Sequence, residues 1–374
     1  MFAGAFAGRR VFVTGDSGFK GAWLASWLVQ LGAEVTGYAL DPPTDPSLFD
    51  GLDLGGQVRQ VVADVRDRDR LAAEVAAARP AVIFHLAAQS LVRLGYAKPH
   101  ETFETNVIGT VNVLEAARGR DSVEAVVIVT SDKCYRNLEV GHPFREDDAM
   151  GGRDPYSASK GCAELVAGAY RDSFFKAPGS AAVASARAGN VIGGGDWAPE
   201  RIIPDCVRAL AADEPVLVRN PNAVRPWQHV LEPLSGYLQL ASVMLRDGHL
   251  HEGPWNFGPA SQDGARPVRW VVEHFLEAWG SGSWTSPEAT GEPLHEARFL
   301  GLDSTKARNR LGWAPVWDAQ SAVGQTAAWY REHSRGLTAA AARDLMSRQI
   351  RAYESDARAA GLAWAAAEDA AQSR

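Results

Sequence analysis

Residues 10–24 read RVFVTGDSGFKGAWL, a short apolar strand followed by a glycine-rich turn and the start of a helix. Gly15, Gly18 and Gly21 have the spacing Gly-x-x-Gly-x-x-Gly, a looser relative of the dinucleotide-binding fingerprint. The first glycine allows a tight turn, the second admits a pyrophosphate to the backbone, and the third lets the helix pack on the strand. The segment therefore predicts a phosphate-binding turn at the start of an α/β domain.

Alternating strands and helices continue this pattern through the first half of the chain. Short apolar runs rich in Val and Ile predict strands at residues 10–13, 34–38, 57–62, 81–85, 125–129 and 182–187. The helices expected between them cover residues 21–31, 67–78, 102–118 and 157–174. Such alternation predicts a parallel sheet covered on both faces, a doubly wound, Rossmann-like α/β fold.

The second half of the chain has a different character. After about residue 190, glycines and prolines break the sequence into short pieces, which predicts a smaller lobe over the carboxyl edge of the sheet. We expect a dinucleotide-binding domain at residues 8–190, to which some later segments return, and a substrate-binding lobe at residues 191–335. Residues 336–374 are rich in alanine and charged side chains, and they predict a helical tail that is either an oligomer contact or a frayed end.

The composition excludes several classes of protein. The 374 residues carry a net charge of -7 without a long basic run, which argues against a nucleic-acid partner. No stretch of uncharged apolar residues is long enough to predict a membrane span, and the N-terminus has no signal-peptide pattern. The three cysteines are too few and too scattered for a disulfide framework or a zinc site. We therefore expect a cytoplasmic protein without a bound metal.

The ends of the next predicted strands carry residues that could hold the rest of a dinucleotide. Asp41 follows the second strand, where a carboxylate binds an adenosine ribose hydroxyl and repels a 2′-phosphate. Lys20 could instead attract that phosphate, so the sequence favours NAD and leaves NADP open. Asp64-Val65 could bind an adenine, and the small residues of Leu86-Ala87-Ala88 leave room for the cofactor backbone.

Tyr156 and Lys160 are four residues apart on a predicted helix and therefore one turn apart on the same face. The ammonium can lower the pKa of the phenol, so that Tyr156 takes a proton from an alcohol while a nicotinamide receives hydride. Ser131, at the end of the fifth strand, can orient that hydroxyl. The adjacent Asp132 and Lys133 add an acid and a base, as elimination of water would require. The alternative for these two residues is a solvated loop pair.

These interpretations define two predicted groups of residues. The predicted catalytic residues are Ser131, Asp132, Lys133, Tyr156 and Lys160. The predicted cofactor-binding residues are Gly15, Gly18, Phe19, Gly21, Asp41, Asp64, Val65, Leu86, Ala87, Ala88, Tyr156 and Lys160.

Longer segments resemble a known enzyme family. The glycine-rich turn, the fourth strand end and the Tyr-Lys helix resemble the extended short-chain dehydrogenase/reductase family, at residues 14–21, 85–89 and 156–160. Four further segments are similar to the branch of that family that dehydrates CDP-linked glucose, at residues 130–135 (TSDKCY), 154–165 (DPYSASKGCAEL), 187–197 (RAGNVIGGGDW) and 219–230 (RNPNAVRPWQHV). The resemblance runs from about residue 10 to about residue 333.

This resemblance implies a closed redox cycle on a CDP-hexose, with NAD as a cofactor that is not consumed. Tyr156 would deprotonate the glucose 4-hydroxyl, and Asp132 would protonate the departing 6-hydroxyl. Lys133 would remove the C5 proton; most nucleotide-sugar dehydratases carry glutamate there, whereas lysine is what the CDP-glucose branch shows. The resemblance also implies a homodimer, formed through the helix that bears Tyr156 and Lys160 and the long helix before it.

Charged and amide side chains are expected to hold the sugar nucleotide. Arginine offers a planar, permanent charge to a pyrophosphate, and by resemblance Arg225 matches the pyrophosphate position of the family. Asn190 and Arg201 match further family positions, and Arg298 and Gln89 complete the predicted substrate site. Cytosine selection follows from the resemblance alone.

Two other functions remain open at this stage. A nucleotide-sugar 4-epimerase or a plain dehydrogenase would share Ser131, Tyr156 and Lys160 but would not need Asp132 as an acid. An NAD-binding regulator on a disused dehydrogenase scaffold is the third reading, because a fold does not determine a function.

Overall fold

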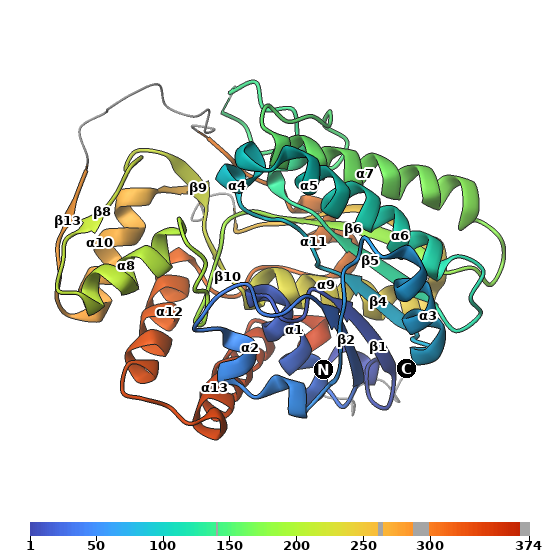
Figure 1. Cartoon of the computed structure of the whole chain (residues 1–374), viewed down its shortest axis with the longest axis horizontal. Coiled ribbons are helices and arrows are strands. Elements are labelled where there is room, and N and C mark those ends of the chain that lie inside the picture. Colours follow the sequence, from blue (N-terminus) through green and yellow to red (C-terminus); the bar gives the residue numbers. More distant parts are fainter. Residues whose placement is uncertain (140, 261–264, 287–298, 367–374) are drawn as a thin grey trace.

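The computed structural model describes residues 1–374 apart from 140, 261–264, 287–298 and 367–374. Within the described residues, seven strands form one parallel sheet with helices on both faces (Figure 1). Their order is β11-β6-β5-β4-β1-β2-β3, and their bounds are β1 (Arg10–Thr14), β2 (Glu34–Ala39), β3 (Arg59–Val62), β4 (Val82–His85), β5 (Ala125–Val129), β6 (Ala182–Ala188) and β11 (Gly253–Phe257). The predicted doubly wound α/β fold is confirmed.

Six of these strands match the predicted ones to within two residues at either end. Every residue of β5 and β6 is buried, which explains why β5 is an unbroken apolar run, while β6 carries the buried polar residues Ser185 and Arg187 among its apolar ones. The seventh strand, β11, has no predicted counterpart. Its sequence GPWNF is short and combines apolar and polar residues without the alternation that indicates a strand. It pairs with β6 in parallel register, with Gly253 opposite Ala184 and Phe257 opposite Ala188.

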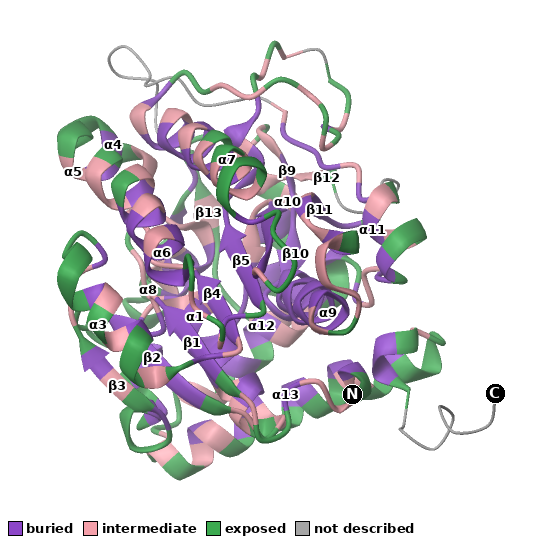
Figure 2. Ribbon diagram, turned by 90° about the vertical axis from the view of Figure 1, so that its right-hand side faces the viewer, coloured by how far each residue is buried: buried purple, intermediate pink, exposed green. Residues whose placement is uncertain are grey.

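Two hydrophobic cores lie on the two faces of the sheet. One contains side chains of α3 (Arg68–Ala78), α6 (Gly109–Ala117) and α7 (Pro155–Phe174). The other contains side chains of α1 (Phe19–Gln30) and α9 (Leu231–Asp247). Figure 2 shows that α9 is buried over most of its length, so its apolar face is not confined to one stripe.

The predicted helix at residues 102–118 is divided in the structure. It begins earlier, as α5 (Pro99–Phe103), continues through a π-helical segment (Glu104–Ile108) and ends as α6. Proline at the first helical position favours this earlier start. The wider π turn is where the buried Asn106 lies, and π segments often occur at functional sites.

Short elements after β6 form the smaller part of the molecule. Three two-stranded pairs join β7 (Val191–Ile192) with β10 (Gln228–His229), β9 (Val224–Pro226) with β12 (Ala265–Pro267), and β8 (Val216–Leu217) with β13 (Trp284–Thr285). The helices of this region are α8 (Ile202–Ala211), α10 (Val268–Trp279), α11 (Thr305–Leu311) and α12 (Ala319–His333). Figure 1 places β8, β13, α8 and α10 together at one end of the molecule.

The alanine-rich C-terminal stretch forms a helix, α13 (Ala339–Ala359), that packs on the main domain. Trp27 Nε1 of α1 donates to Glu354 Oε1 over 2.9 Å, and Arg343 Nη1 donates to the Leu52 carbonyl over 2.7 Å. The remaining short elements are α2 (Leu48–Gly51), α4 (Val92–Ala97) and 3-10 turns at Phe2–Gly4, Leu54–Gly56, Asp132–Cys134, Gly248–His251 and Ala363–Ala365. None of the helices in the described ranges is both long and apolar enough to span a membrane.

Candidate active site

The glycine-rich turn joins β1 to α1 at the carboxyl edge of the sheet. Gly15 has a φ of 76°, and a Cβ added to it would lie 2.6 Å from the Ala87 nitrogen. A Cβ on Gly21 would lie 2.1 Å from the Gly15 carbonyl oxygen. Gly18 is the N-cap of α1 and offers no side chain to the first-turn N–H groups, which can bind an anion. The turn therefore fits a dinucleotide pyrophosphate and tolerates no side chain at Gly15 or Gly21.

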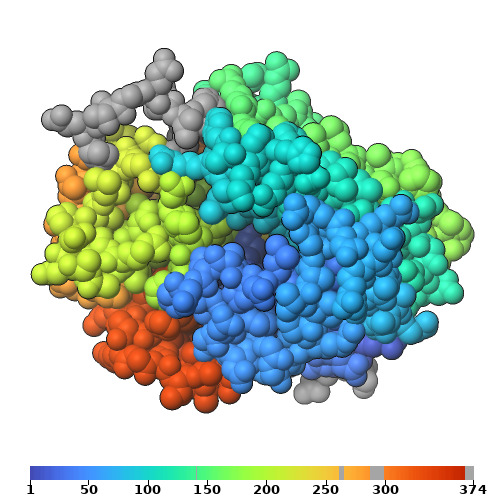
Figure 3. Space-filling model, in the orientation of Figure 1, coloured from blue at the N-terminus to red at the C-terminus, as the bar shows by residue number. Residues whose placement is uncertain are grey.

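Neighbouring residues line this turn as predicted for a cofactor site. The Leu86 nitrogen donates to the Thr14 carbonyl over 3.0 Å, and the Ala87 nitrogen donates to Thr14 Oγ1 over 3.2 Å. These bonds hold the 86–88 loop, including Ala88, beside the glycines. Phe19 begins α1, and a Cβ on Gly193 would lie 3.2 Å from its ring. Figure 3 shows a hollow on this face of the molecule, bordered by the blue, cyan and yellow-green parts of the chain.

Asp16 lies inside the same turn and was not singled out by the sequence. It is fully buried, and its Oδ2 atom has no hydrogen-bond partner among the described residues. Gln60 Nε2 donates to Oδ1 over 3.5 Å, and a Cβ on Gly37 would lie 2.0 Å from Oδ2. Burial raises the pKa of Asp16 to about 6. The turn therefore contains a carboxyl group whose charge changes close to neutral pH.

Lys20 belongs to the catalytic end of the site. Its Nζ lies 5.9 Å from the centre of the Tyr237 ring. Burial lowers the pKa of Lys20 to about 7, helped by the charges of Arg201 and Lys160 and opposed by that of Asp132. Because its electrostatic neighbours are residues of the catalytic end, Lys20 gives no support to binding of a 2′-phosphate.

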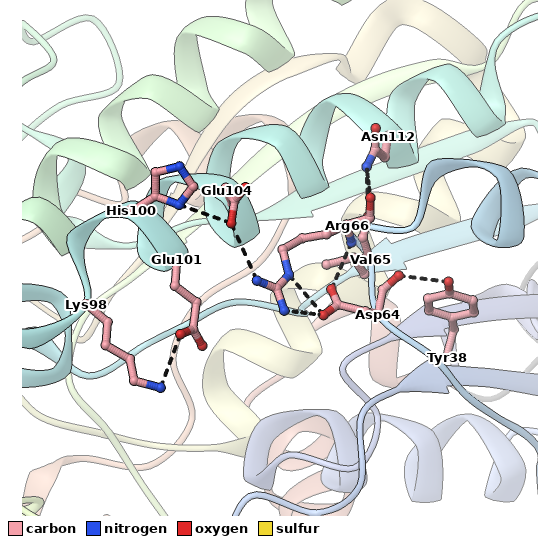
Figure 4. A network of polar contacts seen from close by, with 9 residues as sticks. All are labelled: Tyr38, Asp64, Val65, Arg66, Lys98, His100, Glu101, Glu104 and Asn112. Atoms are coloured by element: carbon pink, nitrogen blue, oxygen red, sulfur yellow. Dashed lines mark hydrogen bonds and ion pairs between the residues drawn. The ribbon is translucent and has the colours of Figure 1, made fainter.

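The predicted adenosine end lies beside β2 and β3, and Figure 4 shows its polar contacts. Asp41 is exposed in the loop after β2. Asp64 accepts from Arg66 at the backbone nitrogen, Nε and Nη2, over 2.8, 2.9 and 2.6 Å. Partial burial raises the pKa of the Asp64 carboxyl, but these hydrogen bonds from Arg66 outweigh it and lower the pKa overall. Arg66 Nη1 also lies 3.6 Å from Glu104 Oε2. An adenine would therefore share the Asp64 carboxylate with Arg66, a residue that the sequence analysis missed.

Val65 contributes to the core and does not present its side chain to an adenine. It is 4% exposed, and a Cβ on Gly109 would lie 2.9 Å from its Cγ2. Its carbonyl accepts from Asn112 Nδ2 over 2.9 Å (Figure 4). Binding of the adenine by Val65 stays a prediction for its backbone N–H group.

Gln89 is held by the protein itself. Its Nε2 donates to Thr102 Oγ1 over 2.9 Å, and its Oε1 accepts from the Leu91 nitrogen over 2.6 Å. Asn106 Nδ2 donates both to the Gln89 carbonyl over 3.0 Å and to Ser159 Oγ over 2.8 Å. The Gln89 amide thus shapes the loop after β4, and these bonds leave it one N–H and one oxygen lone pair for a sugar. Asn106, which no local motif indicates, ties this loop to the catalytic helix.

Ser131 and Asp132 follow β5 and open a 3-10 turn at the same edge of the sheet. Ser131 Oγ donates to Asp132 Oδ1 over 3.0 Å and accepts from the Lys133 nitrogen over 3.2 Å. Asp132 is 2% exposed, and its Oδ2 has no hydrogen-bond partner among the described residues. Burial raises the pKa of Asp132, although Lys133 and Arg225 oppose this rise. A buried carboxyl group with a raised pKa retains its proton to higher pH than an exposed aspartate and is therefore suited to act as an acid.

Tyr156 and Lys160 lie on the first two turns of α7 and are 8% and 6% exposed. Burial raises the pKa of Tyr156 to about 12, opposed by a hydrogen bond with Ser131 and by the charge of Arg201. Burial also lowers the pKa of Lys160 to about 8, and its Nζ donates to the Val129 carbonyl over 3.3 Å. The expected lowering of the phenol pKa is therefore outweighed by burial in this structure.

Lys133 lines a cavity of about 370 Å³ beside the catalytic turn. Arg136 and Arg153 also line this cavity, as do Asp154 and Ser157 at the start of α7. Lys133 is only partly buried, unlike Asp132. Its role as a base therefore stays a prediction and depends on the position of its flexible side chain.

Arg225, the predicted pyrophosphate residue, lies on β9 close to the catalytic turn. It is 3% exposed, and its Nη1 donates to the Val224 carbonyl over 2.9 Å. Its charge opposes the raised pKa of Asp132, which places the guanidinium within electrostatic reach of the catalytic acid. This is where a sugar pyrophosphate needs a cation if its hexose reaches Asp132.

The other predicted substrate residues border the same region. Arg201 Nη1 donates to Asp196 Oδ2 over 2.9 Å, and its Nη2 donates to Ser90 Oγ over 3.1 Å. The Asn190 carbonyl accepts from the Gln228 nitrogen over 3.1 Å. Arg298 lies outside the described residues.

Comparison with known proteins adds independent information. A protein-family model described as GDP-mannose 4,6 dehydratase matches residues 12–326. The chain is 47% identical over 333 residues to a CDP-glucose 4,6-dehydratase of Salmonella typhimurium, an alignment that covers 88% of this chain and 92% of that protein. It is 30% identical over 327 residues to a dTDP-glucose 4,6-dehydratase of Streptomyces griseus, with 86% and 94% covered.

Two solved structures share the fold. A dTDP-glucose 4,6-dehydratase from Streptomyces venezuelae with NAD bound has a TM-score of 0.74 and 25% identity, with 87% of this chain and 98% of that chain covered. A Thermus thermophilus UDP-glucose 4-epimerase complexed with NAD has a TM-score of 0.73 and 25% identity, with 86% and 99% covered. Because a dehydratase and an epimerase share this fold, the site residues must distinguish them.

Proposed function

This chain belongs to the GDP-mannose 4,6 dehydratase family, and on that basis we propose that it is a lyase that converts CDP-D-glucose to CDP-4-dehydro-6-deoxy-D-glucose and water. The resemblance inferred from the motifs is confirmed by the 47% identity to the Salmonella enzyme. One observation of the structure carries the choice of reaction: Asp132 is a buried acid with a raised pKa, next to Ser131 and Tyr156, and its Oδ2 has no hydrogen-bond partner within the described part of the chain. Oxidation of an alcohol alone does not need that acid.

The cofactor is NAD, which the glycine turn fits. When bound, NAD would supply reversible hydride transfer, from C4 of the sugar and back to C6. Gly15, Gly18 and Gly21 would hold its pyrophosphate, and Asp41 would bind the adenosine ribose and disfavour NADP. The position of Lys20 at the catalytic end supports the same preference, because it places that cation away from Asp41 and the predicted ribose site.

The side chains of the chain divide the proton transfers between them. Tyr156 accepts the proton of the 4-hydroxyl in its phenolate form, which burial disfavours and the charge of Arg201 favours. Ser131 orients that hydroxyl through its hydrogen-bonding side chain. The 4-ketone that results acidifies the C5–H bond, so a base can remove that proton. As the C6–O bond breaks, Asp132 donates its proton to the departing hydroxyl, which leaves as water. A proton returns to C5 when hydride returns to C6, so the product differs from the substrate by one water, with no net redox change.

Lys133 is the residue proposed to remove the C5 proton. Lys133 directly follows Asp132 and lines a cavity together with Asp154 and Ser157 at the start of α7. Lys133→Ala should therefore keep NAD binding and C4 oxidation but lose exchange of the C5 hydrogen with deuterium in D2O. Unchanged exchange, followed by NMR, would exclude Lys133 as the base.

The experiment that tests the proposed function is a panel of CDP-, dTDP-, UDP- and GDP-glucose with catalytic NAD. We expect a 4-keto-6-deoxy product from CDP-glucose, detected by its absorbance in alkali and by mass, with no net NADH. An epimerase would yield a 4-epimer of unchanged mass. A protein that holds NAD but converts none of the four sugars would be a regulator.

A homodimer is the proposed assembly. Large apolar side chains are exposed on the two helices expected to pair, namely Phe103 (37%) and Ile108 (50%) before α6, and Leu165 (63%) on α7. Such surface is costly to leave in water and is typical of an interface. Light scattering of the native protein should give the mass of a dimer, and the Leu165→Glu variant should give the mass of a monomer. A native protein with the mass of a monomer would contradict the proposed dimer.

Two other features complete the proposal. The reduced thiols of Cys134, Cys162 and Cys206 support a cytoplasmic enzyme of deoxysugar biosynthesis. The proposed domains are a cofactor-binding unit at residues 8–190, to which later segments return, a nucleotide-sugar lobe at residues 191–335, and a C-terminal helical segment at residues 336–374. The parallel pairing of β11 with β6 supports the return of a later segment.

A further inference from the structure

A buried ion pair lies next to the catalytic residues. Glu164 follows Lys160 by four residues on α7 and so lies one turn further along the same face. Its Oε2 is 2.7 Å from Nη2 of Arg187 on β6, and the two side chains are 4% and 3% exposed. Removing two charges from water is costly, and neither residue has a step in the reaction described above. The pair therefore needs an explanation.

The carboxylate of Glu164 holds the start of the catalytic turn. It accepts hydrogen bonds from Thr130 Oγ1, from Ser185 Oγ over 2.6 Å and from Arg187. Burial opposes its charge, but Arg187 and these donors lower the pKa of Glu164. Thr130 directly precedes Ser131, so one end of the turn is bonded to α7.

The guanidinium of Arg187 holds the other end of the catalytic turn, at Tyr135. Its Nη1 donates to Tyr135 Oη over 2.6 Å and to the Glu146 carbonyl over 3.0 Å. The guanidinium carbon also lies 4.8 Å from the centre of the Tyr135 ring. Tyr135 in turn donates to Asn256 Oδ1 over 2.7 Å, which connects the turn to β11.

Thr130 and Tyr135 flank the residues Ser131 to Cys134, and the bonds from both lead to the same ion pair. We propose that Glu164 and Arg187 are a positioning pair that holds both ends of this turn against α7 and thereby fixes Asp132 relative to Tyr156. The inference rests on the proposed function, because Tyr156 and Asp132, on separate elements, must act at C4 and C6 of one sugar. A displacement of about 1 Å can cost about 100-fold in rate.

A double variant separates positioning from folding. Glu164→Gln with Arg187→Met removes both charges together, so that neither is left buried alone, and replacements of this kind are often tolerated. We expect a melting temperature near that of the native protein, a KM for CDP-glucose within about 3-fold, and a kcat lower by about 100-fold. Amide hydrogen exchange of residues 130–135 should become faster, while that of β1 and β4 stays unchanged.

Arg187→Lys is a second variant for use if the double variant folds poorly. Lysine keeps the buried charge beside Glu164 but lacks the planar fork that reaches Tyr135 at the same time. The same faster exchange of residues 130–135 and a similar loss of kcat are expected. Tyr353→Phe is the matched control, because it removes a buried hydrogen bond to Glu232 Oε2 of 2.8 Å that does not involve the turn. It should lower the melting temperature without changing kcat or exchange in the turn.

Native kcat together with native exchange in residues 130–135 of a folded variant would overturn the positioning role and leave the pair as a folding element. Amide exchange requires no turnover, so it tests the pair separately from the reaction. If the native protein left CDP-glucose unchanged while the variants still showed faster exchange in the turn, the proposed function would fail and the structural part of this inference would stand.

Discussion

The catalytic edge and the adenosine edge are built on the same sheet but differ in their exposure to water. At the catalytic edge, Asp132, Tyr156 and Lys160 are 2%, 8% and 6% exposed. At the adenosine edge, Asp41 is exposed and the Arg66 side chain is 37% exposed. Both edges lie where parallel strands end, so topology alone does not explain the difference.

Burial determines what the charged groups at the two edges can do. At the catalytic edge it raises the pKa of Asp132, raises that of Tyr156 to about 12 and lowers that of Lys160 to about 8. At the adenosine edge, the bonds from Arg66 outweigh partial burial and lower the pKa of Asp64. The catalytic edge, which we call the dry edge because its charged groups are buried, is therefore suited to proton transfer. The adenosine edge, the wet edge, is exposed to solvent and is suited to recognition by hydrogen bonds.

The largest expected effect is that of Tyr156→Phe at the dry edge. The substitution removes the proton acceptor for the 4-hydroxyl and keeps the buried ring, so kcat should fall by about 1,000-fold without loss of folding. Steady-state assays with CDP-glucose and thermal melting test this together. A loss below about 10-fold would mean that burial of the phenol serves packing and not catalysis.

Asp132→Asn should have the next largest effect and should alter the course of the reaction. Asparagine fits the same space but cannot supply the proton for the leaving hydroxyl, so elimination should slow by about 100-fold. NADH absorbance at 340 nm should then persist in a single turnover, because C4 oxidation still occurs. Rapid decay of that absorbance would contradict the acid role.

The same acid predicts a pH dependence. Asp132 must be protonated to act, and its pKa is raised, so kcat should fall as pH rises through the folded-state pKa of this group. In Asp132→Asn this alkaline fall should be absent from the elimination step. An identical pH profile in both proteins would assign the fall to another group.

At the wet edge, Asp41→Asn should have a moderate effect. Loss of a charged acceptor for the ribose hydroxyls should weaken NAD binding by about 10-fold, because a hydrogen bond to a charged group is worth about 1.5–3 kcal/mol. Binding of NADP should improve at the same time, since the repulsion is removed. Calorimetric titration of both cofactors measures the two changes, and parallel loss of both would contradict the ribose role.

Arg66→Ala should have the smallest effect. Exposed ion pairs contribute about 0–1 kcal/mol, so the melting temperature should hardly change. Freeing the Asp64 carboxylate from Arg66 should change the affinity for NAD by no more than about 3-fold, and less in high salt. A 100-fold change in the affinity for NAD would show that the ion pair at the exposed adenosine edge contributes as much as groups at the buried catalytic edge.

Local patterns predicted much of this structure. The strand ends, the glycine turn and the Tyr156–Lys160 spacing depend on residues close in sequence, and the six predicted strands are found within two residues of their expected ends. β11, the buried Asp16 and the bonds of Asn106 were missed, because each depends on a segment distant along the chain. The helix predicted at 102–118 is found, but its earlier start at Pro99 and its π-helical turn at Glu104–Ile108 were not predicted.

The sequence by itself determined the order of strands and helices, the phosphate-binding turn and the chemical groups available at the strand ends. Only the tertiary structure decided which of those groups are buried. Asp132 is buried and its pKa is raised, the side chain of Val65 packs in the core, and Asp41 is exposed to solvent. The physical reason is that spacing follows from covalent geometry, whereas burial and electrostatics depend on which distant segments pack together. The bonds from Glu164 and Arg187 to both ends of the catalytic turn are such a long-range arrangement.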